Sequence, residues 1–237
     1  MRIAFFGGSF DPPHCGHLAI ARAAIDFLGL DRVLFAPVGA QPLKRELRSS
    51  SYADRLAMVE LAIEGDPRFG VSLLDAPREN GQPNFTLRTL SELRQALSPE
   101  DELFCLIGAD SFLNLKQWHG AQDLLFACDF IVAGRPGFLL NDLGSILPEG
   151  VRVSGDPKLF SPGCLSVLIE NPSRLRAHLY LLPDLNADIS ASEIRNALQA
   201  TADPRHEVQA VLPAAVVSYI RDHGLYSEDR AAARVEN

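Results

Sequence analysis

Strand-like and helix-like runs alternate through the first half of the chain, and this alternation limits the possible folds more than any other feature. Short runs rich in apolar and β-branched residues are followed by runs with apolar residues three and four positions apart. We expect strands at 2–6, 32–38, 71–74, 102–107 and 130–133, and helices at 18–28, 52–63, 86–97 and 118–126. Strands that alternate with helices form β-α-β units, so the sequence predicts an α/β fold with a mostly parallel sheet and helices on both faces.

The second half is less regular. Residues 134–176 contain five prolines and several glycines, so we expect an irregular insertion at about 138–177 with short strands near 151–153 and 166–169. A strand at 178–182 follows. Ser190 then caps a helix to about 199, with Glu193 three residues on as a capping box, and Pro213 opens a C-terminal helix that Gly224 stops. No linker divides the chain, so we expect one domain over 1–226 and a frayed tail over 227–237.

Composition excludes several classes of function. Lys and Arg number 22 against 30 Asp and Glu, a net charge of −8, which argues against non-specific binding to nucleic acid or to an anionic membrane. No apolar run approaches the roughly 18 residues of a membrane span. The four cysteines form no C-x-x-C pair, so we expect free thiols and a cytoplasmic protein, with Cys105 and Cys128 filling the core.

The segment from Gly7 to His17 carries the strongest chemical signal. It reads Gly-Gly-Ser-Phe-Asp-Pro-Pro-His-Cys-Gly-His, directly after the first predicted strand and at the start of the first helix. Ligands of open α/β sheets bind at the carboxyl ends of the strands, and a helix N-terminus at that place suits phosphate. Gly7 and Gly8 allow a ligand close to the backbone.

His14 and His17 are three residues apart and therefore share one side of the first helical turn. Two imidazoles at a phosphate site donate hydrogen bonds to its oxygens, and Gly16 leaves room between them for a base or a ribose. Two alternatives stay open on the residues alone. The histidines can be incidental to a glycine-rich turn, or they can bind a metal with Asp11 as the third ligand.

The Gly7–His17 string resembles the signature of the nucleotidyltransferase superfamily that carries an H-x-G-H element. Further segments resemble the nicotinate-nucleotide adenylyltransferase family, and the resemblance covers roughly residues 1–135 and 178–226. These segments are Asn84-Phe85-Thr86, Gly108–Phe112 with Trp118, Arg135-Pro136-Gly137, Ile189–Arg195, and the ending from Leu212-Pro213 to Leu225-Tyr226.

The resemblance implies a Rossmann-like, doubly wound sheet and transfer of the adenylyl group of ATP to nicotinate mononucleotide, giving deamido-NAD and pyrophosphate in NAD biosynthesis. It implies catalysis by His14 and His17, and Mg²⁺ bound mainly through the ATP phosphates, with no metal ligand from the protein. The implied ATP-binding residues are Gly7, Gly8, Ser9, Phe10, Gly16, Lys44, Ile189, Ser190 and Arg195. The implied residues for the mononucleotide are Thr86, Gly108, Asp110, Trp118, His119 and Arg135.

Several of these residues also have an interpretation that involves no ligand. Trp118 stacks on the pyridine ring or packs in the core, and Asp110 binds a ribose or caps the next helix. Arg195 contacts phosphate or forms a surface ion pair, and Lys44 reaches the triphosphate or is simply solvated. The chain also departs from the family pattern, with Leu43 where a histidine is frequent, Ala191 within the I-S-S-T element, and a longer stretch at 138–177.

Two other functions and one property stay open. The acceptor can instead be nicotinamide mononucleotide or phosphopantetheine, although phosphopantetheine enzymes are typically shorter and lack the pair Thr86 and Trp118. The chain can also be a non-catalytic nucleotide sensor on the same fold, but simple binding would not need His14, His17 and Arg195 together. The sequence leaves the choice between a monomer and a homo-oligomer undecided.

Overall fold

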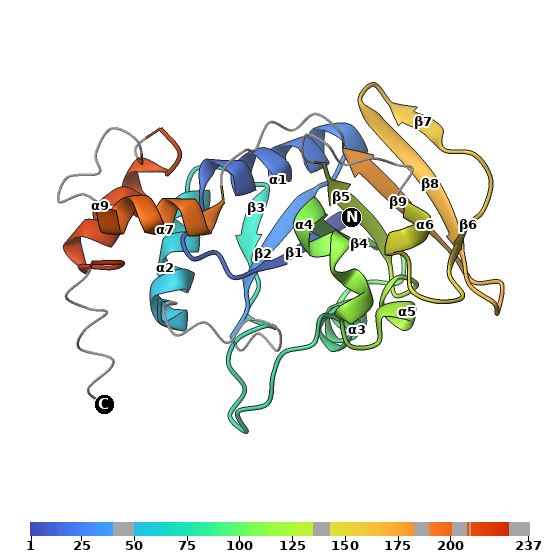
Figure 1. The fold of residues 1–237 in the computed structure, drawn as a ribbon, viewed down its shortest axis with the longest axis horizontal. Coiled ribbons are helices and arrows are strands. Elements are labelled where there is room, and N and C mark those ends of the chain that lie inside the picture. The colour runs from blue at the N-terminus through green and yellow to red at the C-terminus, as the bar shows by residue number, and fades with distance from the viewer. Residues whose placement is uncertain (40–49, 135–142, 183–189, 201–207, 209, 228–237) are drawn as a thin grey trace.

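One sheet organises the molecule. The computed structural model describes residues 1–39, 50–134, 143–182, 190–200, 208 and 210–227. Within these residues nine strands form a sheet in the order β3-β2-β1-β4-β5-β9-β8-β6, and β7 also pairs with β8 (Figure 1). The pairings from β3 to β9 are parallel, whereas β8 pairs antiparallel with β9, β6 and β7. The predicted α/β fold with a mostly parallel sheet is confirmed.

The elements have the following bounds. The strands are β1 (Arg2–Gly8), β2 (Arg32–Pro37), β3 (Phe69–Val71), β4 (Glu102–Gly108), β5 (Asp129–Ala133), β6 (Arg152–Val153), β7 (Lys158–Ser161), β8 (Cys164–Glu170) and β9 (Arg176–Leu182). The helices are α1 (Cys15–Leu28), α2 (Tyr52–Ile63), α3 (Thr86–Ala96), α4 (Ala109–Leu113), the 3-10 helix η1 (Leu115–Gln117), α5 (Ala121–Leu124), α6 (Leu143–Ile146), α7 (Ala191–Ala200) and α9 (Ala214–Asp222).

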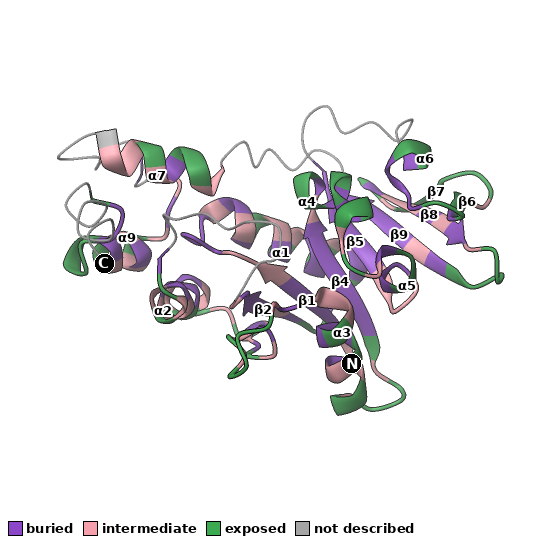
Figure 2. Cartoon of the chain, turned by 60° about the horizontal axis from the view of Figure 1, so that its bottom comes forward, coloured by how far each residue is buried: buried purple, intermediate pink, exposed green. Residues whose placement is uncertain are grey.

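Two hydrophobic cores lie on opposite faces of the sheet, because successive side chains of a strand point to opposite sides. Ala4 and Phe6 of β1 belong to the core that packs against α1, α2, α7 and α9. Phe5 belongs to the core that packs against α3, α4, α5 and α6. The central strands are therefore buried along most of their length (Figure 2), as the near-continuous apolar runs of parallel strands require.

Local capping sets the ends of the predicted helices. Gly29 follows α1 with φ +62°, a conformation that glycine adopts without strain, and its N–H donates to the carbonyl of Ile25 at 2.8 Å. Ser51 precedes α2, and its Oγ accepts from the N–H of Asp54 at 3.1 Å. At α7 the predicted capping box is present, since the Glu193 N–H donates to Ser190 Oγ at 3.2 Å and the Ser190 N–H donates to Glu193 Oε2 at 2.9 Å.

The structure corrects some predicted boundaries. β1 does not stop before Gly7 and Gly8, because both glycines pair with β2. The predicted strand at 71–74 lies at 69–71. The short helix predicted at 118–126 is present only as α5, four residues within that range. Trp118 is the C-cap of η1 and Gly120 has φ +63°, so a left-handed glycine divides the helical pattern of apolar residues.

The stretch expected to be irregular contains more regular structure than the sequence indicated. Short strands occur near both predicted positions, as β6 and β8, and a further strand, β7, pairs with β8. Their antiparallel pairing extends the parallel sheet beyond β9. The predicted frayed tail lies, except for Ser227, outside the described residues.

Membrane and cysteine predictions can be compared with the described residues. In this part of the chain, no helix combines the length and the apolar character that crossing a membrane requires. The four cysteines carry free thiols. Cys105 lies in the core, where burial raises the pKa of its thiol, whereas Cys128 is only half-buried at the margin of the core.

Candidate active site

The glycine- and histidine-containing loop after β1 lies where the strand order of the sheet reverses. β1 and β4 are neighbours in parallel register, and the chain continues from them to opposite outer halves of the sheet. At such a switch point the segments that follow the two strands diverge and leave a ligand-binding position at their carboxyl ends. Gly8 ends β1 and Gly108 ends β4, so the predicted site residues of both loops meet at one edge of the sheet.

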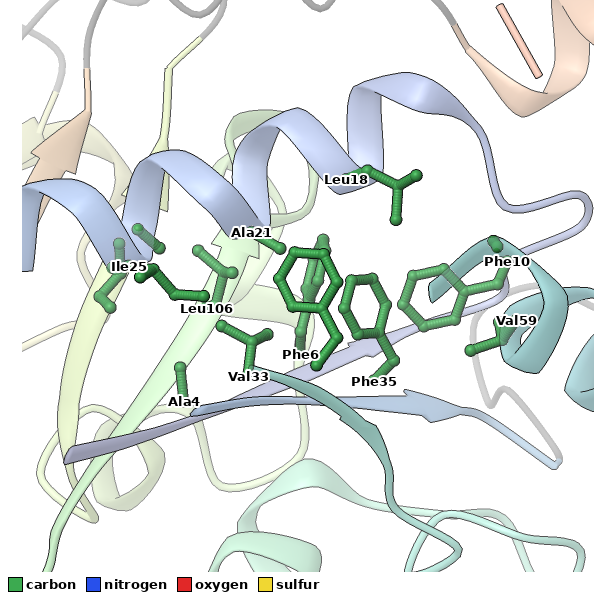
Figure 3. Close-up of a cluster of buried hydrophobic side chains, with 14 of the residues drawn as sticks. Ala4, Phe6, Phe10, Leu18, Ala21, Ile25, Val33, Phe35, Val59 and Leu106 are labelled. Atoms are coloured by element: carbon green, nitrogen blue, oxygen red, sulfur yellow. The ribbon is translucent and has the colours of Figure 1, made fainter. Parts of the chain in front are cut away.

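Phe10 anchors this loop in the core. Its φ is +50°, a conformation that residues other than glycine rarely adopt, and it is 1% exposed. The ring centroid lies 5.5 Å from that of Phe6 and 5.6 Å from that of Phe35 (Figure 3). It lies 4.9 Å from that of His17. Phe10 was expected among the ATP-binding residues, but its burial shows that the side chain holds the loop in place and is not available to a ligand.

Packing gives Gly7 and Gly8 a role beyond ligand approach. A Cβ atom at Gly7 would lie 2.9 Å from a ring carbon of Phe5, and one at Gly8 would lie 3.2 Å from the ring of Phe10. Both distances are shorter than ordinary van der Waals contact. The two glycines therefore let aromatic rings pack against each side of the strand end. Ser9 and Gly16 complete the predicted set here, with Ser9 half-buried in the loop and Gly16 buried in the first turn of α1.

His14 and His17 lie together at the start of α1. Their ring centroids are 3.7 Å apart and the ring planes differ by 32°. The backbone N–H of His14 donates to Nδ1 of His17 at 3.2 Å. An Nδ1 that accepts a hydrogen bond carries no proton, so the neutral His17 ring holds its proton on Nε2 and presents an N–H donor there.

The surroundings keep His17 neutral. Burial lowers the pKa of His17 well below its usual value of 6.5, and the neighbouring His14 lowers it further. A buried imidazolium would lose its hydration and would face a second imidazole at close range. His17 can therefore donate a hydrogen bond to an anionic oxygen without first releasing or taking up a proton.

Arg195 of α7 lies beside the same loop. Its Nη1 donates to the carbonyl of Asp11 at 2.8 Å, and its Nη2 donates to Ser192 Oγ at 3.2 Å. The structure thus brings the predicted phosphate-binding helix to the histidine loop, although 184 residues separate the two partners. Ser190, in front of the helix, offers its N–H and hydroxyl, and both donate to Oε2 of Glu193.

Asp11 has a different role from the metal ligand considered above. Its carboxylate accepts from the N–H of Ser50 at 3.2 and 3.3 Å and from the hydroxyl of Tyr226 at 2.6 Å. Among the described residues, no group of three or more His, Cys, Asp and Glu side chains comes together as a metal site. The residues near His14 and His17 offer mainly nitrogen and hydroxyl donors, which suit an anion.

The residues predicted for the acceptor lie on the other side of the sheet. Thr86 is the first residue of α3, and Phe85 in front of it packs against His119, with ring centroids 4.3 Å apart. Trp118 is half-buried and packs at the margin of the core, so it combines the core contact with an accessible part. The start of α3 and the loop after η1 therefore meet.

Gly108 and Asp110 lie at the end of β4. Gly108 is the N-cap of α4, and Asp110 is an exposed residue of its first turn, where a carboxylate interacts favourably with the helix dipole. Asp110 is thus not the N-cap residue. Three other predicted site residues, Lys44, Arg135 and Ile189, lie outside the described residues.

Sequence reasoning missed two buried residues next to the loop. Arg55 is 5% exposed, and its Nη1 and Nη2 donate to the carbonyls of Ser9 at 2.7 Å and Val38 at 2.8 Å. The helical pattern could have indicated the burial of Arg55, because this residue lies on the same face of α2 as the buried Met58, Val59 and Ala62. Tyr226 belongs to the ending that resembles the family, but the sequence did not indicate its contact with Asp11, which joins residues 215 positions apart.

Comparisons with known proteins agree with this architecture. The cytidylyltransferase-like family matches residues 5–197. A protein of Solibacter usitatus named probable nicotinate-nucleotide adenylyltransferase is 36% identical over 227 residues, which cover 96% of this chain and 100% of the relative. One from Pelobacter propionicus with the same name is 36% identical over 228 residues, 96% of this chain and 99% of the relative.

A solved structure shows the same fold. The nicotinic acid mononucleotide adenylyltransferase of Plasmodium falciparum, complexed with NaAD, superposes with a TM-score of 0.69 at 16% identity and covers 95% of this chain and 97% of its own. The full-length relatives above 30% identity carry the family assignment. With its histidine loop at the switch point of an α/β sheet, the chain belongs to the nicotinate-nucleotide adenylyltransferase family, within the cytidylyltransferase-like proteins.

Proposed function

We propose that this protein transfers the adenylyl group of ATP to nicotinate mononucleotide, giving deamido-NAD and pyrophosphate. One observation carries the proposal: His14 and His17 lie 3.7 Å apart between ring centroids, at the switch point of the sheet and in the loop whose Asp11 carbonyl binds Arg195. This arrangement concentrates donors for anionic oxygens in one place. Family membership supports both the donor and the acceptor, since full-length relatives bear the name of this activity.

The reaction needs no nucleophile from the protein. An oxygen of the 5′-phosphate of the mononucleotide attacks the α-phosphorus of ATP, a new P–O bond forms, and the bond from the α-phosphorus to the bridging oxygen breaks. Pyrophosphate leaves with the electron pair of that bond. Catalysis then consists of positioning and of stabilising the charge that develops on the phosphate oxygens.

His14 and His17 act on the α-phosphate in this proposal. Nε2–H of His17 donates to an oxygen of the transition state, because Nδ1 is already engaged by the N–H of His14. His14 shares that position through its adjacent ring. Ser190 and Arg195, together with Lys44 and Ile189, bind the β- and γ-phosphates and the departing pyrophosphate, while Gly7, Gly8, Ser9 and Gly16 shape the surface against which ATP lies.

The acceptor lies against α3 and the loops after β4. Thr86 donates to the nicotinate carboxylate, and the accessible part of Trp118 stacks on the pyridine ring. His119, held against Phe85, contributes from its backbone to the same carboxylate. Gly108, Asp110 and Arg135 border the ribose and phosphate of the mononucleotide.

Mg²⁺ enters with the triphosphate as part of the substrate. The described side chains around the histidines do not form the carboxylate-rich set that Mg²⁺ prefers, because the carboxylate of Asp11 is bound by Ser50 and Tyr226. The residues of the chain therefore contact the phosphates rather than the metal ion.

Pyrophosphate release tests the proposal. The purified protein is incubated with MgATP and one acceptor at a time: nicotinate mononucleotide, nicotinamide mononucleotide or phosphopantetheine. We expect fast release with the nicotinate compound. Faster pyrophosphate release with another acceptor would overturn the assignment of Thr86 and Trp118. ATP binding without pyrophosphate release in the presence of any acceptor would favour a sensor.

A further inference from the structure

The C-terminal part of the chain holds the histidine loop at two points. The N–H of Cys15 donates to the carbonyl of Val211 at 2.8 Å, and the hydroxyl of Tyr226 donates to Oδ1 of Asp11 at 2.6 Å. These contacts lie on either side of His14 in the sequence. The position of His14 thus depends on residues close to the end of the described chain.

Asp11 is the centre of this arrangement. It is 2% exposed, and its carboxylate accepts from Ser50 of the segment before α2 as well as from Tyr226. Its carbonyl accepts from Arg195 of α7. A buried carboxylate is costly unless hydrogen bonds satisfy it, so Ser50 and Tyr226 stabilise the side chain of Asp11 in this position.

Arg55 is a buried cation near Asp11. Its guanidinium joins the ends of β1 and β2 through the carbonyls of Ser9 and Val38, and its charge interacts favourably with that of Asp11. Tyr226 lies in the same buried environment at 8% exposure. Burial raises the pKa of Tyr226, and the charge of Asp11 raises it further, so its hydroxyl keeps its proton and stays a donor.

We propose that Tyr226 is a positioning residue for adenylyl transfer, which acts through Asp11 to set both the histidine loop and Arg195. This inference rests on the proposed function. The two groups that Asp11 joins belong to the ATP side of the site. The acceptor residues Thr86 and Trp118 lie on α3 and after η1, and none of the hydrogen bonds around Asp11 described above connects to them.

Substitution of one hydroxyl tests this inference. In the full-length protein, Tyr226→Phe removes the donor to Asp11 and keeps the ring. Tyr219→Phe is the matched control, because its hydroxyl also donates to an aspartate, Oδ1 of Asp54 at 3.2 Å, and also joins the C-terminal segment to the region of α2. The kcat, the KM for MgATP, the KM for nicotinate mononucleotide and the Kd for ATP alone are measured, together with the Tm.

We expect Tyr226→Phe to raise the Kd and KM for ATP about tenfold and to lower kcat, since small displacements of catalytic groups are costly. The KM for the acceptor should stay unchanged, and Tyr219→Phe should leave all four constants unchanged.

A purely structural role predicts another pattern. Unfolding of part of the sample lowers kcat and Tm but leaves both KM values as they are, and this result would overturn the inference, as would an unchanged Kd for ATP. Amide hydrogen exchange of residues 9–17 gives a readout without substrate, and it should be faster in Tyr226→Phe than in Tyr219→Phe. Failure of the proposed function is separate, because it shows in the wild type as missing pyrophosphate release.

Discussion

The backbone N–H of His14 donates a hydrogen bond to Nδ1 of His17 at 3.2 Å. The residue that carries one imidazole therefore fixes the tautomer of the other. The proton of neutral His17 lies on Nε2, and the helix start orients it together with His14. A single hydrogen bond in the first turn of α1 thus determines which ring nitrogen carries the proton that the proposed reaction directs to the α-phosphate.

Substitution of His17 should remove a donor to the transition state without loss of the fold. His17→Asn keeps an acceptor near the His14 N–H but has no Nε2–H, so we expect turnover to fall by about 10²–10³. His178→Asn is the control, since His178 lies on β9 and bonds to Ser166 away from the loop. Steady-state rates of pyrophosphate release measure the effect, and near-normal turnover of His17→Asn would refute the catalytic role.

The stability of the fold should decrease in mild acid because of His17. Its folded-state pKa is lowered by burial and by His14, whereas the unfolded value is about 6.5. Below that value the unfolded chain takes up a proton that the folded chain does not, so the free energy of unfolding falls as pH drops from about 7 to 5. Denaturation curves over this range should show a shallower pH dependence for His17→Asn than for the wild type. Equal slopes for the two proteins would contradict the lowered pKa.

The helices and strands with a clear apolar periodicity could be predicted from the sequence, because the periodicity and the capping residues are local features. The helix over 52–63 is confirmed residue for residue, since Ser51 caps it and its apolar face repeats every three to four positions. The helix predicted over 118–126 is shorter than expected for a local reason that composition does not express. Gly120 takes a left-handed conformation, a 3-10 turn before it ends at Gln117, and the helix begins only at Ala121.

The site was readable only in part. Motifs marked His14, His17 and Arg195, and the structure brings Arg195 to the loop that carries the two histidines. Long-range contacts were not readable, because the hydrogen bond between Tyr226 and Asp11 depends on how the whole chain folds. Phe10 could not be recognised as a core residue either. It lies in a motif typical of ligand-binding loops, whereas the structure buries it in the core that packs against α1 and α2.

Trp118 should contribute to binding of the acceptor and not of ATP. Trp118→Ala removes the ring proposed to stack on the pyridine, so we expect the KM for nicotinate mononucleotide to rise about tenfold, the scale of about 1–1.5 kcal/mol for one aromatic contact. The KM for MgATP should not change. Trp118→Phe keeps an aromatic face and should recover most of the binding. An unchanged acceptor KM in Trp118→Ala would leave only the core-packing role.

Two glycine substitutions should differ in their cost. A Cβ at Gly39 would lie 2.6 Å from Cα of Pro77, and the backbone has no room to yield, so Gly39→Ala should destabilise the fold by about 1–3 kcal/mol. A Cβ at Gly70 would lie 2.7 Å from a guanidinium nitrogen of Arg32, an exposed side chain that can move away. Gly70→Ala should therefore change stability by less than about 1 kcal/mol. Equilibrium unfolding in urea measures both, and equal costs would contradict the packing argument.

Glu193 should oppose ATP binding while it stabilises α7. Its Oε2 accepts from the N–H of Ser190 at 2.9 Å and from the hydroxyl of Ser190 at 2.8 Å, and these donors are proposed to hold the ATP phosphates. If Ser190 binds phosphate as proposed, ATP has to displace a carboxylate that also repels it. Glu193→Ala should lower the Kd for ATP a few-fold, although the loss of the capping box costs about 1 kcal/mol of stability. Glu92→Ala, on the exposed face of α3, is the control. A weaker affinity for ATP in Glu193→Ala would mean that the carboxylate prepares Ser190 for the phosphates instead of competing with them.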